Sequence, residues 1–184
     1  MQKIIGISGS LRKGSYNTAL LRAAAEFAPP PTKVEIVSIN EIPLYNGDLE
    51  EEQGIPAAVR TIKDQIAVAD GLLLVTPEYN NSIPGVFKNT IDWLSRPDSD
   101  IDRVFGNKAV ALMGATPGRG GTRLAQVAWL PVLRTLGART WSGEQLYVAS
   151  AGQVFDSAGK LMDEKIKKLL TAFMVGYSRF ISGK

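Results

Sequence analysis

The chain has 184 residues, a formal net charge of +3, and neither cysteine nor histidine. The two absences exclude thiolate nucleophiles, disulfides, cysteine-held iron–sulfur clusters, imidazole-bound metals and Ser-His-Asp triads. No apolar run approaches the ~20 residues that cross a bilayer, so we expect a cytoplasmic protein with one domain over residues 1–184 and no membrane partner. If the protein is an enzyme, we expect a bound organic cofactor rather than a metal to supply the difficult step.

Strand-like and helical segments alternate along the chain. The expected strands are residues 3–8, 33–39, 71–76, 108–115 and one within 139–148, and the expected helices are residues 18–27, 56–69, 84–94, 122–136 and 163–180. Three of the strands are nearly continuous apolar runs, as in parallel strands that are buried on both faces. The pattern predicts an α/β fold, a doubly wound sheet of five parallel strands with helices on both faces.

The loop after the first strand is dense in glycine and hydroxyl residues and leads directly into a helix. Ser10, Ser15 and Thr18 offer hydroxyl donors, Arg12 offers a forked cation, and the helix N-terminus attracts anions. A plain turn with a helix cap needs fewer of these groups, so the loop predicts a phosphate site. It is not a nucleotide triphosphatase loop, because Lys and Ser/Thr do not follow Gly14.

Ligands of doubly wound sheets lie beyond the carboxyl ends of the strands, which directs attention to two further loops. Residues 77–85 read PEYNNSIPG after the third strand, and residues 115–121 read ATPGRGG after the fourth. The acidic segment 40–55 carries no such chemistry, and we interpret it as a solvated surface loop.

The helices over 84–94 and 122–136 carry more apolar residues than one-sided burial needs. Such a surplus favours a subunit contact over a thick core, with Trp93 and Trp129 among the contact residues. Pro131 is expected to kink or interrupt its helix.

Between Asp102 and Glu144 the chain contains no acid but six basic residues, namely Arg103, Lys108, Arg119, Arg123, Arg134 and Arg139. A solvated basic face and an anion-binding surface both fit this run. A nucleic-acid partner is not expected, because closely packed cations interleaved with aromatic residues are missing.

The motifs GSLRKGSYN at residues 9–17 and PEYNNSIPG at residues 77–85 resemble the NADPH-dependent FMN reductase family, and within it the bacterial chromate and quinone reductases. The resemblance covers essentially the whole chain. It implies a flavodoxin-like fold, non-covalent FMN, NADPH or NADH as electron donor, and a homodimer or homotetramer. The implied acceptors are quinones, chromate or azo compounds.

The resemblance also implies site residues. The FMN site comprises Ser10, Arg12, Ser15, Tyr16, Asn17 and Thr18 at the phosphate, Pro77, Glu78, Tyr79 and Asn80 at the ring, and Thr116, Gly120 and Gly121 beyond it. Tyr79 and Arg119 are the expected substrate contacts. Tyr79 fits a packing role equally well, and Glu78 is expected to cap or solvate its turn rather than act as an acid.

The implied reaction is ping-pong hydride transfer through flavin N5, with no obligatory side-chain acid or base. Two alternatives stay open at this point. One is a flavodoxin-like electron carrier without its own NAD(P)H turnover, although the basic charge balance disfavours it. The other is a flavin-free phosphate-binding or scaffold protein of the same fold.

Overall fold

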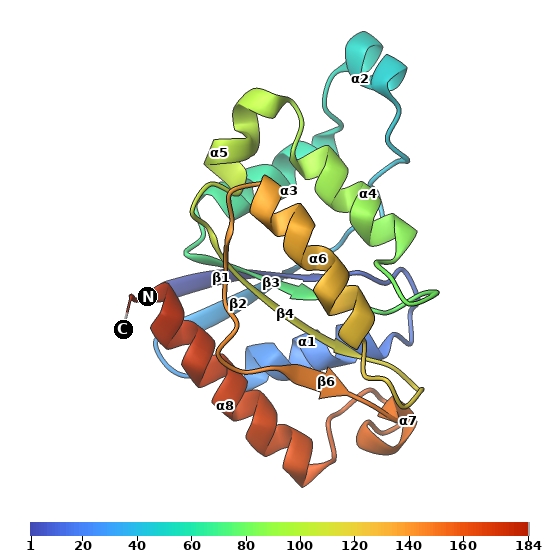
Figure 1. Ribbon diagram of the computed structural model, residues 1–184, viewed down its shortest axis with the longest axis vertical. Coiled ribbons are helices and arrows are strands. Elements are labelled where there is room, and N and C mark those ends of the chain that lie inside the picture. The colour runs from blue at the N-terminus through green and yellow to red at the C-terminus, as the bar shows by residue number, and fades with distance from the viewer. Residues whose placement is uncertain (184) are drawn as a thin grey trace.

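A parallel sheet runs through the middle of the molecule, between two layers of helices (Figure 1). The computed structural model describes residues 1–183. The strands are β1 (Gln2–Ser8), β2 (Thr32–Val37), β3 (Gly71–Val75), β4 (Ala109–Ala115), β5 (Arg139–Thr140) and β6 (Leu146–Val148). They are arranged in the order β2-β1-β3-β4-β5, with β6 also paired to β4, and every pairing is parallel. The predicted flavodoxin-like doubly wound fold is confirmed.

The fifth expected strand is divided into β5 and β6. Between them the Trp141 ring packs against the last helix, 4.8 Å from the ring of Phe173 and 5.7 Å from that of Tyr177. Gly143 follows closely, and a Cβ there would lie 2.7 Å from the Trp141 indole nitrogen. The chain leaves the sheet at this point, so the last strand position is filled in two short pieces.

Helices cover both faces of the sheet (Figure 1). One face carries α1 (Tyr16–Glu26) and α8 (Glu164–Ile181), and the other carries α3 (Ala57–Ala67), α4 (Gly85–Leu94) and α6 (Arg123–Thr135). Shorter helices are α2 (Gly47–Gln53), η1 (Asp98–Asp100), α5 (Ile101–Val104) and α7 (Ala151–Val154). Alternate residues of β3 enter opposite cores: Leu73 faces α1 and α8, and Leu74 faces the other layer.

The two tryptophans expected at a subunit contact lie in the core. Trp93 and Trp129 are both 0% exposed. The Trp129 ring packs edge-on against Phe87 at 5.0 Å, and its indole N–H donates to Thr76 Oγ1 at 3.2 Å. The prediction that they contact a second subunit is therefore wrong. Helix α6 also continues through Pro131 to Thr135, so the proline does not end it.

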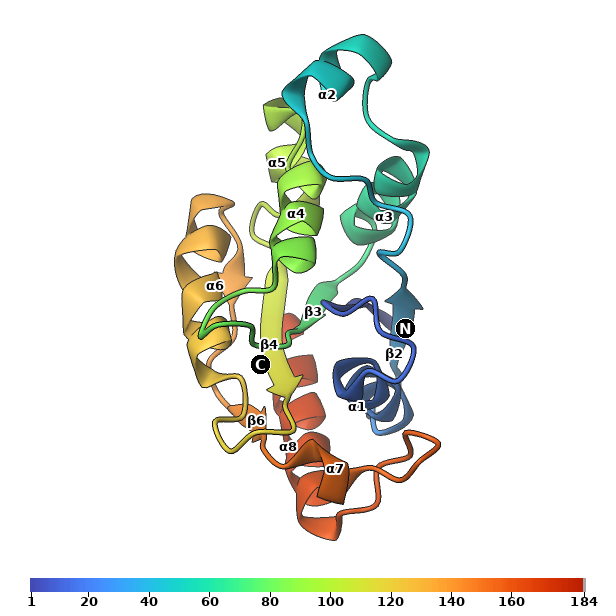
Figure 2. The same ribbon diagram turned by 90° about the vertical axis from the view of Figure 1, so that its right-hand side faces the viewer.

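The acidic segment 40–55 lies at the surface, as expected, and none of its residues is buried, but it is not wholly a loop. It contains α2, which Figures 1 and 2 both show beyond the end of α4. The Trp93 indole donates to the Pro43 carbonyl at 2.9 Å, and Glu50 accepts from Tyr45 Oη at 3.0 Å and from Arg96 Nε at 2.9 Å. Burial acts to raise the pKa of Glu50, but the hydrogen bonds from Arg96 and Tyr45 outweigh it and lower the pKa below its usual value.

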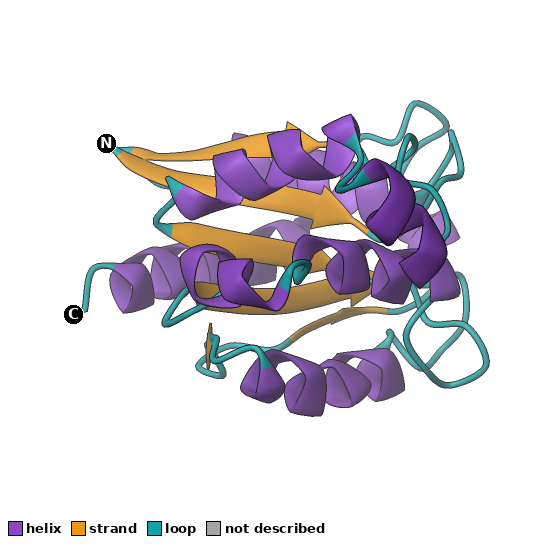
Figure 3. Cartoon of the chain, turned by 90° about the horizontal axis from the view of Figure 1, so that it is seen from above, coloured by secondary structure: helices purple, strands orange, loops and turns teal. Residues whose placement is uncertain are grey.

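The loops that follow the strands gather at one end of the sheet, and both chain ends lie at the other (Figure 3). Gln2, at the start of β1, donates its side-chain amide to the Ser178 carbonyl and to Ser182 Oγ, both at 3.1 Å. Among the helices of residues 1–183, none has the length and apolar composition that crossing a membrane requires.

Candidate functional site

A cleft at the carboxyl end of the sheet is lined by residues from three loops. The lining residues are Ser10, Arg12, Ser15, Tyr16 and Asn17 after β1, Pro77, Glu78 and Tyr79 after β3, and Ala115, Thr116 and Pro117 at the end of β4. Apart from Ala115 and Pro117, each of them is a predicted site residue. The topology thus joins segments that are separated by about a hundred residues in the sequence, as expected where strand order reverses.

Gly9 sets the path of the first loop through close packing. A Cβ at this position would lie 2.1 Å from the ring of Phe87, so only glycine lets the backbone pass α4 here. The Gly9 N–H also donates to the Val75 carbonyl at 2.9 Å, which anchors the loop to the end of β3. The turn that follows is therefore held at a fixed place above the sheet.

The start of α1 leaves donors available for an anion. Ser15 caps the helix, since its Oγ accepts from the Thr18 N–H at 3.3 Å. Within residues 1–183, the backbone N–H groups of Tyr16 and Asn17 have no protein acceptor. First-turn N–H groups of this kind, at the positive end of the helix, are well placed to bind a phosphate.

Asn17 joins the first loop to β4. Its Nδ2 donates to the Ala115 carbonyl and its Oδ1 accepts from the Ala115 N–H, both at 2.9 Å. The side chain is buried, 4% exposed. Its amide therefore positions two loops against each other, and its backbone N–H is the group that faces an anion.

Arg12 and Tyr16 also line the cleft near the start of α1. Arg12 is exposed, and no carboxylate of residues 1–183 lies within 4.0 Å of its guanidinium, which leaves both sides of the fork for a ligand. The Tyr16 ring instead stacks on the ring of Phe155, with 6.0 Å between the ring centroids, and this contact holds the end of the loop in place.

The other end of the cleft is apolar. Pro77 is buried, while the Tyr79 side chain is 49% exposed. Tyr79 and Ser82 exchange backbone hydrogen bonds of 3.2 and 3.0 Å across Asn80 and Asn81, which have φ of 50° and 62°. This is a two-residue turn with both central residues left-handed, a conformation that asparagine tolerates. The asparagines are therefore explained by the turn, and Asn80 does not line the cleft.

Glu78 is bound to helix α6. Its Oε2 accepts from the N–H groups of Leu124 at 2.8 Å and Ala125 at 3.0 Å. Thr122, which precedes the helix with φ of 77°, makes no side-chain cap of its own. A carboxylate from the β3 loop thus supplies the cap and interacts favourably with the helix dipole. The sequence suggested capping for Glu78, but not across two loops.

The structure leaves several predicted site residues outside the cleft. They are Thr18, Asn80, Arg119, Gly120 and Gly121. The Thr18 hydroxyl donates to Ser8 Oγ at 2.9 Å, in a neighbouring pocket. Gly121 has a φ of 74°, and a Cβ there would lie 2.6 Å from that of Tyr147, so the backbone explains this glycine. Arg119 and Gly120 are exposed.

The chain is similar to known proteins along most of its length. A family model described as NADPH-dependent FMN reductase matches residues 2–153. The chain is 44% identical over 168 residues to an NAD(P)H-dependent FMN reductase of Pseudomonas aeruginosa, with 91% of this chain and 89% of the relative covered. It is 38% identical over 179 residues to a 2-hydroxy-1,4-benzoquinone reductase of a Burkholderia species, with 97% and 96% covered.

A solved structure is similar along the whole chain. FerB, a flavoenzyme NAD(P)H:(acceptor) oxidoreductase from Paracoccus denitrificans, superposes with a TM-score of 0.88 at 32% sequence identity. The match covers 100% of this chain and 98% of the other.

Proposed function

Because this chain belongs to the NADPH-dependent FMN reductase family, we propose that it is an NAD(P)H-dependent FMN oxidoreductase that reduces quinones. One observation carries the proposal: a single cleft has unpaired helix N–H groups and a free arginine at one end and an apolar wall at the other. FMN has the matching form, with a phosphate dianion at one end and a flat ring at the other.

The residues present fit FMN at both ends. The N–H groups of Tyr16 and Asn17, the hydroxyls of Ser10 and Ser15, and the Arg12 guanidinium would hold the phosphate. Pro77 and Tyr79 would line the ring. Bound FMN would supply the redox chemistry, namely hydride transfer from a nicotinamide to an acceptor.

The role of the protein's own side chains in this reaction is to position the flavin and the substrates. The cleft contains no histidine or cysteine, and the one carboxylate that lines it, Glu78, is occupied at the start of α6. We therefore assign no side chain of the cleft as an acid or base. Tyr79 is half-exposed at the mouth, where it can cover a bound ring or substrate, and Arg119 would attract the anionic dinucleotide by charge.

Quinones are the proposed acceptors because the Burkholderia relative and a 35% identical Escherichia coli relative are named as quinone reductases. A quinone is flat and apolar and fits the wall at Pro77 and Tyr79. Chromate and azo compounds are further proposed acceptors, since an open cleft restricts the acceptor only by shape.

A homodimer or homotetramer is proposed from the surface of α6. Leu124, Val127 and Leu130 are 51%, 57% and 46% exposed and recur at helical spacing on one side of the helix. The row begins at the residue whose N–H Glu78 caps, so an assembly that buried it would also adjoin the ring end of the cleft.

Anaerobic mixing of the FMN-loaded protein with NADPH, and separately with NADH, tests the proposal. Bleaching of the flavin absorbance within the time of turnover, and its return when a small quinone is added, is the expected result. Failure of both dinucleotides to bleach the flavin would favour an electron carrier. A preparation that takes up no FMN would instead favour a flavin-free protein.

A further inference from the structure

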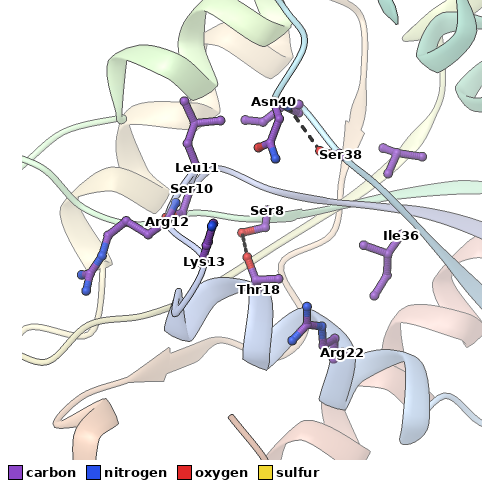
Figure 4. A pocket seen from close by; sticks show the side chains of 12 residues that line it. Ser8, Ser10, Leu11, Arg12, Lys13, Thr18, Arg22, Ile36, Ser38 and Asn40 are labelled. Carbon is purple, nitrogen blue, oxygen red and sulfur yellow. Dashed lines mark hydrogen bonds between the residues drawn. The ribbon is translucent and has the colours of Figure 1, made fainter. Parts of the chain in front are cut away.

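A second pocket lies on the other side of the first loop, between β1 and β2 (Figure 4). Ser8 and Thr18 form its floor, Arg22 projects from α1, and Ser38 and Asn40 face them from the segment after β2. The pocket shares Ser10 and Arg12 with the flavin cleft. The two spaces are therefore neighbours that a single short loop separates.

The pocket carries positive charge that the described chain does not neutralise. Arg12, Lys13 and Arg22 line it, no acid does, and none of the three has a carboxylate of residues 1–183 within 4.0 Å. Glu35, on the adjacent strand, is bound instead to Lys3 at 2.9 Å. What distinguishes the pocket is that three such cations line one small space together with hydroxyl and amide groups.

Neutral donors accompany these cations. Ser8 Oγ accepts from Thr18 Oγ1 at 2.9 Å, and Ser38 Oγ accepts from the Asn40 N–H at 3.3 Å. Each serine therefore retains its own O–H for a ligand. The Asn40 side-chain amide has no partner within residues 1–183. Hydroxyl and amide donors beside cations are the groups that bind a phosphate monoester.

Two exposed apolar side chains also line the pocket, one at each end (Figure 4). Ile36 is 41% exposed and Leu11 is 49% exposed, and both line it. Exposed apolar side chains near cations match a phosphorylated nucleoside, since the base can cover one of the apolar side chains while the phosphate reaches the cations.

We infer that this pocket is a second phosphate subsite and that it takes the adenosine 2′-phosphate of NADPH. The inference rests on the proposed function, because a dinucleotide with its nicotinamide in the cleft must cross the loop of Ser10 and Arg12 to reach the pocket. The 2′-phosphate is the one group that NADH lacks, so the subsite would make the protein prefer NADPH. Inorganic phosphate shares the binding chemistry, and the test separates the two sources.

Binding is measured by calorimetry on the FMN-loaded protein, in which the flavin phosphate already fills the first site. The probes are adenosine 2′,5′-bisphosphate, adenosine 5′-monophosphate and inorganic phosphate. The bisphosphate is expected to bind at least about tenfold more tightly than either other probe. Arg22→Gln and Lys13→Gln should each reduce that advantage about tenfold, because each removes one charged hydrogen bond. Arg134→Gln, an exposed arginine on α6, is the matched control and should bind as the wild type does.

Two results would overturn the inference: equal bisphosphate affinity in the wild type and Arg22→Gln, or inorganic phosphate binding as tightly as the bisphosphate. A second readout is the ratio of kcat/KM for NADPH to that for NADH, which should fall about tenfold in Arg22→Gln. If neither dinucleotide reduces the flavin, the proposed function fails, and the calorimetry still decides separately whether the pocket binds the 2′-phosphate.

Discussion

The Glu78 carboxylate accepts a hydrogen bond of 2.8 Å from the backbone N–H of Leu124, and this bond ties the loop after β3 to the start of α6. The same carboxylate oxygen accepts from Ala125 at 3.0 Å. A residue of the loop that we propose to bind the flavin ring thus caps the helix that follows β4. The position of that loop depends on α6 as much as on β3.

Glu78→Ala should lower the free energy of unfolding by about 1 kcal/mol, as expected for the loss of a helix cap. It should also weaken binding of riboflavin, because the ring-binding loop loses its attachment to α6. Urea unfolding and flavin titration measure the two effects. Glu52→Ala, in the exposed part of α2, is the control. Unchanged stability and unchanged riboflavin affinity would show that the cap is unimportant.

Arg12→Ala should weaken FMN binding by about 1.5–3 kcal/mol, the range for a hydrogen bond to a charged group, and leave riboflavin binding nearly unchanged. Riboflavin has the ring but not the phosphate, so the difference isolates the phosphate contact. Fluorescence titration of both flavins provides the measurement. Equal losses for the two flavins would make Arg12 a structural residue.

A charged substitution tests whether the exposed apolar row on α6 is a subunit contact. Val127→Lys should shift the protein toward monomer in sedimentation velocity at micromolar concentration, because it places a cation in the centre of the proposed contact. Leu169→Lys, which changes a 43% exposed residue on α8, serves as the control for a general surface effect. A wild type that sediments as a monomer would remove the basis for the assembly.

Acid stability should depend on a lysine that is buried between α3 and the segment that follows α4. Lys63 is 2% exposed and contacts Asp100 Oδ2 at 2.7 Å. Hydrogen bonds from Lys63 and then from Arg103 lower the pKa of Asp100 below its usual 3.8. Its stabilising effect is therefore present above that pH and is lost as the pH falls through the lowered pKa.

Asp100→Asn should thus destabilise the protein by about 3 kcal/mol at pH 7, since it leaves Lys63 buried without its counter-charge. The variant and the wild type should converge as the pH falls through the lowered pKa of Asp100. Thermal unfolding between pH 2 and 7 follows the difference, and a constant gap across that range would contradict the assignment.

Steady-state rates with NADPH and a small quinone should give parallel double-reciprocal lines. The cleft has a single apolar wall, at Pro77 and Tyr79, so donor and acceptor would have to use it in turn. Intersecting lines would indicate that both bind at once and would reject a shared cleft.

Much of the fold follows from local sequence patterns. The apolar runs at β1, β3 and β4 are buried on both faces and predict their own positions, and the first loop combines Ser10, Arg12 and Ser15 in a pattern with few other uses. By contrast, burial of Trp93 and Trp129 depends on how residues 43–50 and Thr76 pack around them. Hydrophobic periodicity does not distinguish a face that packs on its own chain from one that packs on a partner.

In the site too, the local sequence identifies the loops, whereas the contacts of individual side chains depend on the fold. Asn17 and Glu78 are part of the loops that the sequence singles out, yet their side chains bind Ala115 and Leu124, which are far away in the sequence. Thr18 directly follows Asn17, which lines the cleft, but its own side chain lines the other pocket. Residue type predicts that a loop binds an anion, but only the fold decides toward which side each donor points.

The hydrogen bonds from Gln2 to Ser178 and Ser182 join the first strand to the last helix at the end of the sheet remote from the cleft. The first strand and the last helix therefore lie side by side, and the loops that line the cleft lie at the opposite end of the sheet (Figure 3). A short linker could join the ends, and new ends could be opened at the exposed Gly54, next to α2, without touching any residue of either pocket. Such a circular permutation would change the order of the strands along the polypeptide and leave the residues that line the two pockets in place.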